Sequence, residues 1–227
     1  MKKEAIVLSL GGSQIIPDNV DIKYLENFKK TISKNKNKYK FIIVCGGGSI
    51  ARKYISVINS KNKKMQSLAG ISATRMNARF MNYFFNQEPK EGIPLKMQQV
   101  KKQIKKQDIV FCGALGYHPN QTSDSTSAQI ATALKTKFIN LTNVKGLYTK
   151  NPKTNKDAKF IPKISWKEFY KMANKLKFHA GQHFVLDQTA SKIILENKIP
   201  TYILGLDTKQ LDNFLNNKKF IGTTIEN

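Results

Sequence analysis

The chain has 227 residues, of which 40% are hydrophobic, so it can bury a sizeable core, and we expect a single domain over residues 1–227. No apolar run approaches the roughly 20 residues that a membrane span needs, and the apolar part of the opening MKKEAIVLSLGG is too short for a secretory signal. The sequence therefore predicts a cytoplasmic protein without a membrane partner. Cys45 and Cys112 show neither metal-ligand spacing nor a disulfide framework, so no protein metal site is predicted.

The formal charge of +24 comes from 39 lysines and arginines against 15 aspartates and glutamates. A balance of this size attracts polyanions without specificity. The lysines are spread along the chain, however, and no RNP, zinc-finger or KH-type motif accompanies them. The pattern favours solvated surfaces over a nucleic-acid site.

Short apolar runs that end at glycine or polar clusters alternate with segments whose apolar residues recur every 3.6 positions. The runs predict strands at 5–10, 41–45, 109–112, 138–141 and 201–204. The periodic segments predict helices at 21–33, 48–59, 67–86, 123–135, 165–175, 187–197 and 207–216, with Ser123, Ser165 and Asp187 as N-caps. This order predicts an α/β fold with a doubly wound, mainly parallel sheet, whose ligands collect at the carboxyl ends of the strands.

The segment FIIVCGGGSIARKYI, residues 41–55, runs from a buried strand through three glycines into a basic helix. Glycine amides at a helix N-terminus can contact phosphate oxygens closely, so a phosphate is one interpretation. A tight turn without a ligand is the other. Residues 11–13 and the stretch GALGYHPNQTSD, residues 113–124, also follow strands, and the three loops together favour the phosphate interpretation.

Seven segments in order carry a resemblance to a known family: LGGS at 10–13, CGGGSIARKYI at 45–55, GISATRMNA at 70–78, HPNQTSDSTSA at 118–128, TNVKGLYTKNP at 142–152, HAGQHFVLDQTASKII at 179–194 and the tail GTTIEN. The chain resembles the amino-acid-kinase superfamily, and within it the archaeal-type UMP kinases. This resemblance implies an αβα sandwich with a mainly parallel central sheet of about eight strands. It also implies an acceptor-side half over about 1–135 and a nucleotide-side half over about 136–227.

The resemblance further implies transfer of the ATP γ-phosphoryl group to UMP, with Mg²⁺ on the donor phosphates, by a homo-oligomer, commonly a hexamer built as a trimer of dimers. The ATP-binding residues would be Gly11, Gly12, Ser13, Gly48, Arg52, Thr142, Tyr148 and Asn151. The UMP-binding residues would be Gly47, Ser67, Gly116, Tyr117, His118, Pro119, Asn120, Gln121, Thr122 and Ser123. Arg52, Asp124 and Ser13 would act in catalysis, because phosphoryl transfer requires positioning and charge neutralisation above all.

Four positions depart from the family pattern. Ser9 stands where many superfamily members have a lysine, and Ser67 stands where the family usually has an aspartate for the UMP ribose. Lys145 and Asn151 each replace an aspartate of the nucleotide loop. These departures leave two alternatives open: a kinase of the same fold with another small phosphate or carboxylate acceptor, and a catalytically weakened protein that binds nucleotides or polyanions.

Several of these residues also have a structural interpretation. Asp124 and Asp187 each lie at a predicted helix N-terminus, where plain capping accounts for an aspartate. Arg52 fits an exposed position on a helix.

Overall fold

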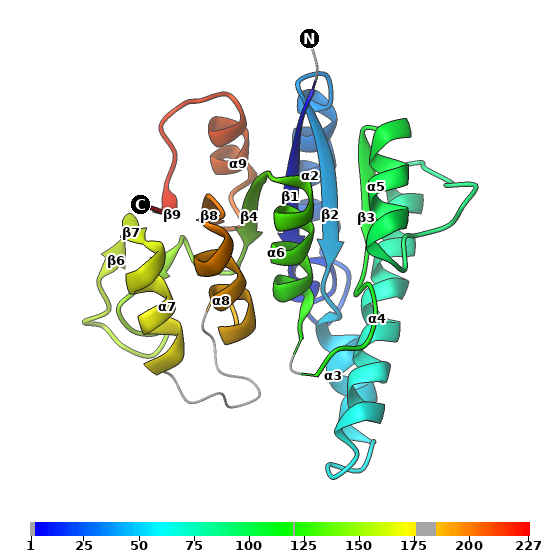
Figure 1. Cartoon of the computed structure of the whole chain (residues 1–227), viewed down its shortest axis with the longest axis horizontal. Coiled ribbons are helices and arrows are strands. Elements are labelled where there is room, and N and C mark those ends of the chain that lie inside the picture. Colours follow the sequence, from blue (N-terminus) through cyan, green and yellow to red (C-terminus); the bar gives the residue numbers. More distant parts are fainter. Residues whose placement is uncertain (1–2, 120, 176–184) are drawn as a thin grey trace.

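The computed structural model describes residues 3–119, 121–175 and 185–227. Its middle layer is a seven-stranded sheet of order β3-β2-β1-β4-β8-β9-β7, with helices on both faces (Figure 1). Neighbouring strands in this sheet are parallel except β8 and β9, which are antiparallel. The strands of the sheet are β1 (Glu4–Leu10), β2 (Tyr39–Cys45), β3 (Ile109–Cys112), β4 (Lys137–Leu141), β7 (Lys163–Ser165), β8 (Thr201–Leu204) and β9 (Gly222–Glu226).

The predicted α/β fold is confirmed, and so are all of its predicted strands and helices. The helices are α1 (Gly12–Ile15), α2 (Ile22–Asn35), α3 (Gly48–Ser56), α4 (Lys63–Phe84), α5 (Met97–Lys106), α6 (Ser123–Leu134), α7 (Trp166–Lys175), α8 (Gln188–Asn197) and α9 (Thr208–Leu215). The expectation of about eight strands is corrected to seven in the described central sheet. The reason is that β5 (Leu147–Tyr148) and β6 (Phe160–Ile161) pair only with each other, as a separate two-stranded sheet.

One of the predicted N-caps is wrong. Thr122, not Ser123, caps α6, because its hydroxyl accepts a hydrogen bond from the backbone N–H of Asp124 at 3.1 Å. The predicted caps at the next helices are confirmed: Ser165 accepts from the backbone N–H of Glu168 at 3.2 Å, and Asp187 accepts from that of Ala190 at 2.8 Å. Each cap satisfies a backbone donor that has no partner inside its helix.

Alternate residues of the central strands face opposite helix layers. Along β1, Ile6 and Leu8 join the core that α2, α4 and α9 cover, whereas Val7 joins the core that α5, α6, α7 and α8 cover. Ser9, two residues after Val7, therefore faces the α6 side, because side chains alternate along a strand. It is only 1% exposed.

The direction of winding reverses between β1 and β4. From β1 the sheet extends through β2 to β3, and from β4 it extends through β8 in the opposite direction. Such a reversal opens a crevice at the carboxyl ends of the two central strands, which is where open α/β sheets bind ligands. Ser9 and Asn140 are register partners at this point.

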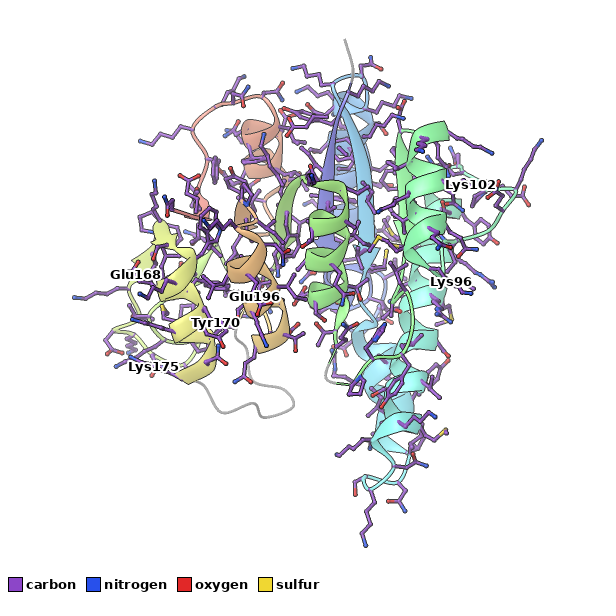
Figure 2. The ribbon with its side chains drawn as sticks, viewed as in Figure 1. Lys96, Lys102, Glu168, Tyr170, Lys175 and Glu196 are labelled. Carbon is purple, nitrogen blue, oxygen red and sulfur yellow. The ribbon has the colours of Figure 1, made fainter. Side chains whose placement is uncertain are left out.

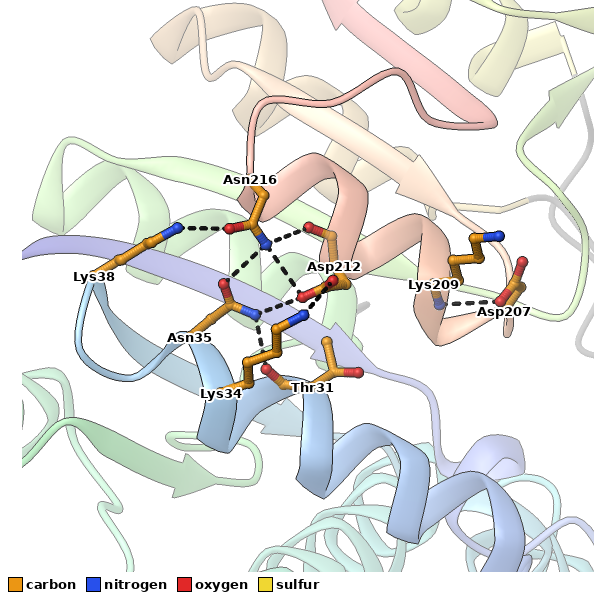
Figure 3. A network of polar contacts seen from close by, with 8 residues as sticks. All are labelled: Thr31, Lys34, Asn35, Lys38, Asp207, Lys209, Asp212 and Asn216. Carbon is orange, nitrogen blue, oxygen red and sulfur yellow. Dashed lines mark hydrogen bonds and ion pairs between the residues drawn. The ribbon is translucent and has the colours of Figure 1, made fainter.

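A polar network ties α2 to α9 near the amino ends of the strands, away from this crevice (Figure 3). Asp212 of α9 accepts hydrogen bonds from the amide of Asn35 at 2.9 Å and from Lys34 at 3.0 Å. Asn35 is 1% exposed and ends the helix that precedes β2. The network therefore joins segments 177 positions apart in the sequence.

Charged side chains project from opposite sides of the protein (Figure 2). Lys96 and Lys102 lie by α5, whereas Glu168 and Lys175 lie on α7. This dispersion agrees with the interpretation of the lysines as solvated surface groups. Among the described residues, no helix combines the length and the apolar character needed to cross a membrane.

Candidate active site

The glycines after β1 and β2 pack backbone against backbone. A Cβ atom on Gly12 would lie 2.0 Å from the nitrogen of Gly48, and one on Gly46 would lie 2.4 Å from the nitrogen of Gly12. Gly48 also has a φ of +63°, a left-handed conformation that favours glycine. The crossing of these two loops therefore requires glycine at these positions before any ligand is considered, and it fixes the start of α3 beside α1.

Two predicted catalytic residues lie exposed at this crossing. Ser13 is in α1 and accepts a hydrogen bond from the side-chain amide of Gln14 at 3.1 Å. Arg52 lies one turn into α3 and makes no hydrogen bond or ion pair with any residue the structure describes. Its guanidinium is thus available to an anion near the N-terminal amides of α3, which themselves favour negative charge.

Asp124 lies at the start of α6, facing the carboxyl end of β1. Its Oδ1 accepts a hydrogen bond of 2.7 Å from the hydroxyl of Ser9. Burial, together with the neighbouring Asp187 carboxylate, raises the pKa of Asp124 to about 7, against the lowering effect of the Ser9 hydrogen bond. Asp124 is therefore not the cap of α6 but a carboxyl group that changes charge near neutral pH.

Asp187 joins this cluster from the N-cap of α8. It accepts hydrogen bonds from the Thr122 hydroxyl and from the backbone N–H of Ala190. Burial raises the pKa of Asp187, and these hydrogen bonds oppose that effect. The contact between Thr122 and Asp187 joins the loop before α6 to α8, so it links the two predicted halves of the chain.

The loop at 113–123, here called the acceptor loop, contains most of the predicted UMP-binding residues. Gly116 and Tyr117 are partly buried, whereas His118 and Pro119 are exposed, and Asn120 lies outside the described residues. Within the loop, the backbone N–H of Gln121 donates to the carbonyl of His118 at 3.3 Å. At its end, the backbone N–H of Thr122 donates to the hydroxyl of Ser125 at 2.8 Å.

Helix α4 bonds to the glycine loop after β2 and to the acceptor loop through residues without a predicted role. The side-chain amide of Asn77 donates to the carbonyl of Gly46 at 2.7 Å, and Thr74 and Arg75 bond to Ala114. Their only sequence signal is their place in the segment GISATRMNA. Ser67 lies on the same helix, where it is exposed and donates to the carbonyl of Lys63 at 2.9 Å.

A cavity of about 300 Å³ brings together three of the predicted ATP-binding residues. It is lined by Thr142, Tyr148 and Asn151, together with Met172 and Lys175 of α7 and with Val185. Most of the cavity wall is formed by the loop that follows the carboxyl end of β4. The pairing of β5 with β6 holds part of this loop in place. Its size and its apolar walls with a few polar groups suit a small ligand such as a nucleoside.

The two departures in the nucleotide loop lie in different places. Asn151 lines the cavity, and its side chain accepts a hydrogen bond from the backbone N–H of Lys153 at 3.0 Å, so it also shapes the loop. Lys145 does not line this cavity but borders a neighbouring hollow beside Gly205 and Asp207. The change at Lys145 therefore leaves the cavity wall itself unaltered.

Over the described residues, no group of three or more histidine, cysteine, aspartate or glutamate side chains could hold a metal ion by itself. Asp124 and Asp187 nevertheless provide carboxylate oxygens, which Mg²⁺ prefers when phosphate oxygens supply the rest of its ligands. The donor set thus fits a metal that arrives with a phosphorylated substrate.

A mainly parallel central sheet, with two crossing glycine loops, a buried carboxyl group and a nucleoside-sized cavity along one edge, defines an α/β protein whose site lies at the carboxyl ends of its strands. Comparison with known proteins identifies the family: residues 4–205 match the model of the amino acid kinase family, and the chain belongs to that family.

Relatives and solved structures cover the chain almost completely. A uridylate kinase from Pyrococcus abyssi is 32% identical over 225 residues, which are 97% of this chain and 99% of the relative. A uridylate kinase from Thermoplasma volcanium is 33% identical over 98% of each chain. The crystal structure of uridylate kinase from Archaeoglobus fulgidus superposes with a TM-score of 0.81 at 29% identity, covering 97% of this chain and 99% of that one.

Proposed function

We propose that this protein is a UMP kinase, which transfers the γ-phosphoryl group of ATP to UMP and yields ADP and UDP. The observation that carries the proposal is the full-length similarity to uridylate kinases at 32% and 33% identity. The geometry supports it, because a nucleoside-sized cavity and the acceptor loop lie at the same edge of the sheet as the crossing glycine loops.

In this proposal, the two substrates meet above the glycine crossing. ATP occupies the cavity at Thr142, Tyr148 and Asn151, and its phosphates extend toward the amides of the two glycine loops. The residues proposed for the phosphates are Gly11, Gly12, Ser13, Gly48 and Arg52. UMP lies between Gly47, Ser67 and the acceptor loop. This arrangement assigns residues of about 1–135 to the acceptor and residues of about 136–227 to the nucleotide.

Catalysis then rests on charge and positioning. The Arg52 guanidinium neutralises charge that grows on the transferred phosphoryl group, and fixed backbone amides add to that effect. Asp124 orients the groups around the phosphates and does not transfer a proton. Asp124 and Asp187 are the carboxylates that would face Mg²⁺ bound with ATP, and the ion would supply positive charge to the donor phosphates.

An acceptor panel tests the activity. ADP release is measured with UMP, CMP, dUMP and isopentenyl phosphate, and a reaction without acceptor measures ATP hydrolysis. We expect UMP to give the highest kcat/KM. A preference for isopentenyl phosphate would favour a kinase of the same fold with another acceptor. ATP binding without turnover on any acceptor would favour a catalytically weakened protein. The departure at Ser67 makes this weakened protein the second candidate.

We also propose that the protein is a homo-oligomer, a hexamer built as a trimer of dimers. Helices α3 and α4 extend beyond the rest of the protein (Figure 1). Several of their large apolar side chains are exposed, among them Tyr54, Met65 and Leu68. Val57, the C-cap of α3, is 84% exposed, and Tyr83, near the C-terminal end of α4, is 63% exposed. Light scattering after size exclusion tests this state, and a Val57→Lys variant that remains hexameric would place the interface elsewhere.

A further inference from the structure

Arginine is rare in this chain, and it occurs only on α3 and α4. The 39 basic residues include three arginines, at positions 52, 75 and 79, and the others are lysines. Because lysine serves as the general surface cation here, a position that keeps arginine is a candidate for a role that needs the planar guanidinium. Arg52 is already part of the proposed phosphate site.

Arg75 bonds to the acceptor loop at its first residues. Its Nε donates to the backbone carbonyl of Ala114 at 3.2 Å. The adjacent Thr74 holds the other backbone group of the same residue, because its hydroxyl accepts from the N–H of Ala114 at 3.0 Å. Two consecutive side chains of α4 therefore fix both polar groups of one loop residue.

Close packing reinforces this attachment. A Cβ atom on Gly113 would lie 2.6 Å from the Thr74 hydroxyl and 2.7 Å from the backbone nitrogen of Arg75, so the chain passes directly against α4 here. Thr74 is 8% exposed and Ala114 is 9% exposed. A buried hydrogen bond of this kind is costly to leave unmade, which keeps the entry to the loop in one position.

The same helix contacts the other parts of the proposed acceptor site. Asn77, 3% exposed, bonds to Gly46 beside the glycine crossing, and Ser67 lies two turns before Arg75. Helix α4 thus sets the distance between the glycine loops and the acceptor loop. The middle of the acceptor loop is more open, since His118 and Pro119 are exposed, so its course depends on how its ends are held.

We propose that Thr74 and Arg75 are positioning residues that fix the entry to the acceptor loop and thereby set the affinity and selectivity for the acceptor nucleotide. This inference rests on the proposed function. Arg75 forms no ion pair with a carboxylate in the described part of the chain, so its contact with Ala114 is the role that the structure gives it. Lysine cannot replace it fully, because its side chain has a carbon at the place of the arginine Nε and carries its only donors at the end of a flexible stem.

The test compares Arg75 with Arg79, which is an exposed arginine four residues later on the same helix. For Arg75→Lys, we expect the KM for the acceptor to rise by about tenfold, the equivalent of about 1.4 kcal/mol, while the KM for ATP stays within about twofold. Arg75→Ala and Thr74→Val should raise the acceptor KM at least as much, and Thr74→Ser, which keeps the hydroxyl, should restore it. Arg79→Lys and Arg79→Ala should match the wild type.

Kinetics are measured with whichever acceptor of the panel the wild type uses best, alongside the ratio of kcat/KM for UMP and CMP and the melting temperature. A wild type that uses no acceptor overturns the proposed function. An active wild type whose acceptor KM is unchanged in Arg75→Lys and Thr74→Val overturns the positioning role. An equal rise in both KM values also overturns it, because a merely structural role would affect both substrates. If Arg75→Ala fails to fold, Arg75→Lys and Thr74→Val decide the matter.

Discussion

The hydroxyl of Ser9, at the end of β1, donates a hydrogen bond of 2.7 Å to the Asp124 carboxylate at the start of α6. Ser9 occupies the position at which many superfamily members have a lysine, so a neutral donor here takes the place of a cation. A hydroxyl can orient the carboxylate, but it adds no positive charge to lower its pKa. Burial and the neighbouring Asp187 carboxylate therefore keep the pKa of Asp124 raised, at about 7, in spite of the bond.

Replacement of Ser9 by alanine should raise the pKa of Asp124 further, because the Ser9 hydrogen bond lowers it. If turnover needs the ionised carboxylate, the acidic limb of the kcat profile moves to higher pH, by about half a unit to one unit. Initial rates between pH 5.5 and 9 measure the shift. A profile that keeps its wild-type position would show that the bond has no influence on the active form.

Ser127→Ala is the matched control for this variant. Ser127 is also fully buried, but its hydroxyl donates to the backbone carbonyl of Ser123 at 2.8 Å. Ser127→Ala also removes a buried hydroxyl, but this hydroxyl does not bond to the Asp124 carboxylate. The pH profile of kcat should therefore keep its wild-type position.

Asp124→Asn separates a structural role of Asp124 from a catalytic one, since the predicted capping role is wrong: Thr122 caps α6, and the Asp124 side chain bonds to Ser9 instead. The folded-state pKa of Asp124, about 7, lies above the ordinary value of 3.8. The folded state therefore holds a proton that the unfolded state releases, so this group contributes stability below pH 4 that is lost as the pH rises to 7. The Asp124→Asn variant has no carboxyl group to ionise here, so it does not lose this stability as the pH rises. Its melting temperature relative to the wild type should rise between pH 4 and pH 8.

Turnover of the same variant should fall by on the order of a hundredfold, the scale of one preorganised electrostatic contact. Asparagine has the shape of aspartate and keeps an oxygen that can accept the Ser9 hydrogen bond, so a structural role alone predicts an unchanged rate. Melting curves across pH and initial rates at pH 8 decide between the two roles: full activity would leave Asp124 with a structural role only.

The sequence patterns were sufficient for the central strands, because β1, β2 and β4 are short, mostly apolar and followed by polar or glycine residues. Helix α5 was missed because its segment MQQVKKQIKK has few apolar residues, although Val100 and Ile104 are buried. Strand β9, GTTIE, was not predicted, because its threonines interrupt the run of apolar residues. Its pairing with β8 depends on a long-range contact that a local pattern cannot show.

The site was predictable where a glycine or a cap marks it, and less so where tertiary contact creates it. The three glycines at 46–48 pointed to a close approach, and the structure shows that the approach includes the backbone of Gly12. The link between Ser9 and Asp124 spans 115 positions, and neither residue carries a local sign of it. Only the packing of α6 over β1 brings them together.

Arg52→Ala should lower turnover by more than about tenfold, or about 1.4 kcal/mol, because Arg52 is proposed to stabilise charge that grows in the transition state. The melting temperature should change little, since Arg52 is exposed and bonds to no described residue. Arg52→Lys should recover the rate in part, because lysine keeps the charge without the planar fork. Lys53→Ala, the neighbouring exposed cation, is the control. Equal rates in the two alanine variants would refute the role of Arg52.

The network between α2 and α9 should support stability without affecting the rate (Figure 3). Asp212→Ala removes the acceptor of Asn35, which is buried, and of Lys34, so the free energy of unfolding should fall by about 1–2 kcal/mol and the melting temperature by several degrees. Turnover per folded molecule should stay at the wild-type level, because the network lies near the amino ends of the strands.

The pH dependence of this effect follows from the direction of the pKa shift. Hydrogen bonds from Asn35 and Lys34 lower the pKa of Asp212, so its stabilising contribution is present above the ordinary value of 3.8 and is lost as the pH falls through the lower folded value. The difference in melting temperature between wild type and Asp212→Ala should therefore be full at pH 7 and shrink below pH 4. Glu91→Ala is the control, because Glu91 pairs with Lys102 at 3.0 Å on the exposed surface, where such pairs contribute little. A Glu91→Ala loss equal to that of Asp212→Ala at pH 7 would mean that burial of Asn35 adds nothing to the network.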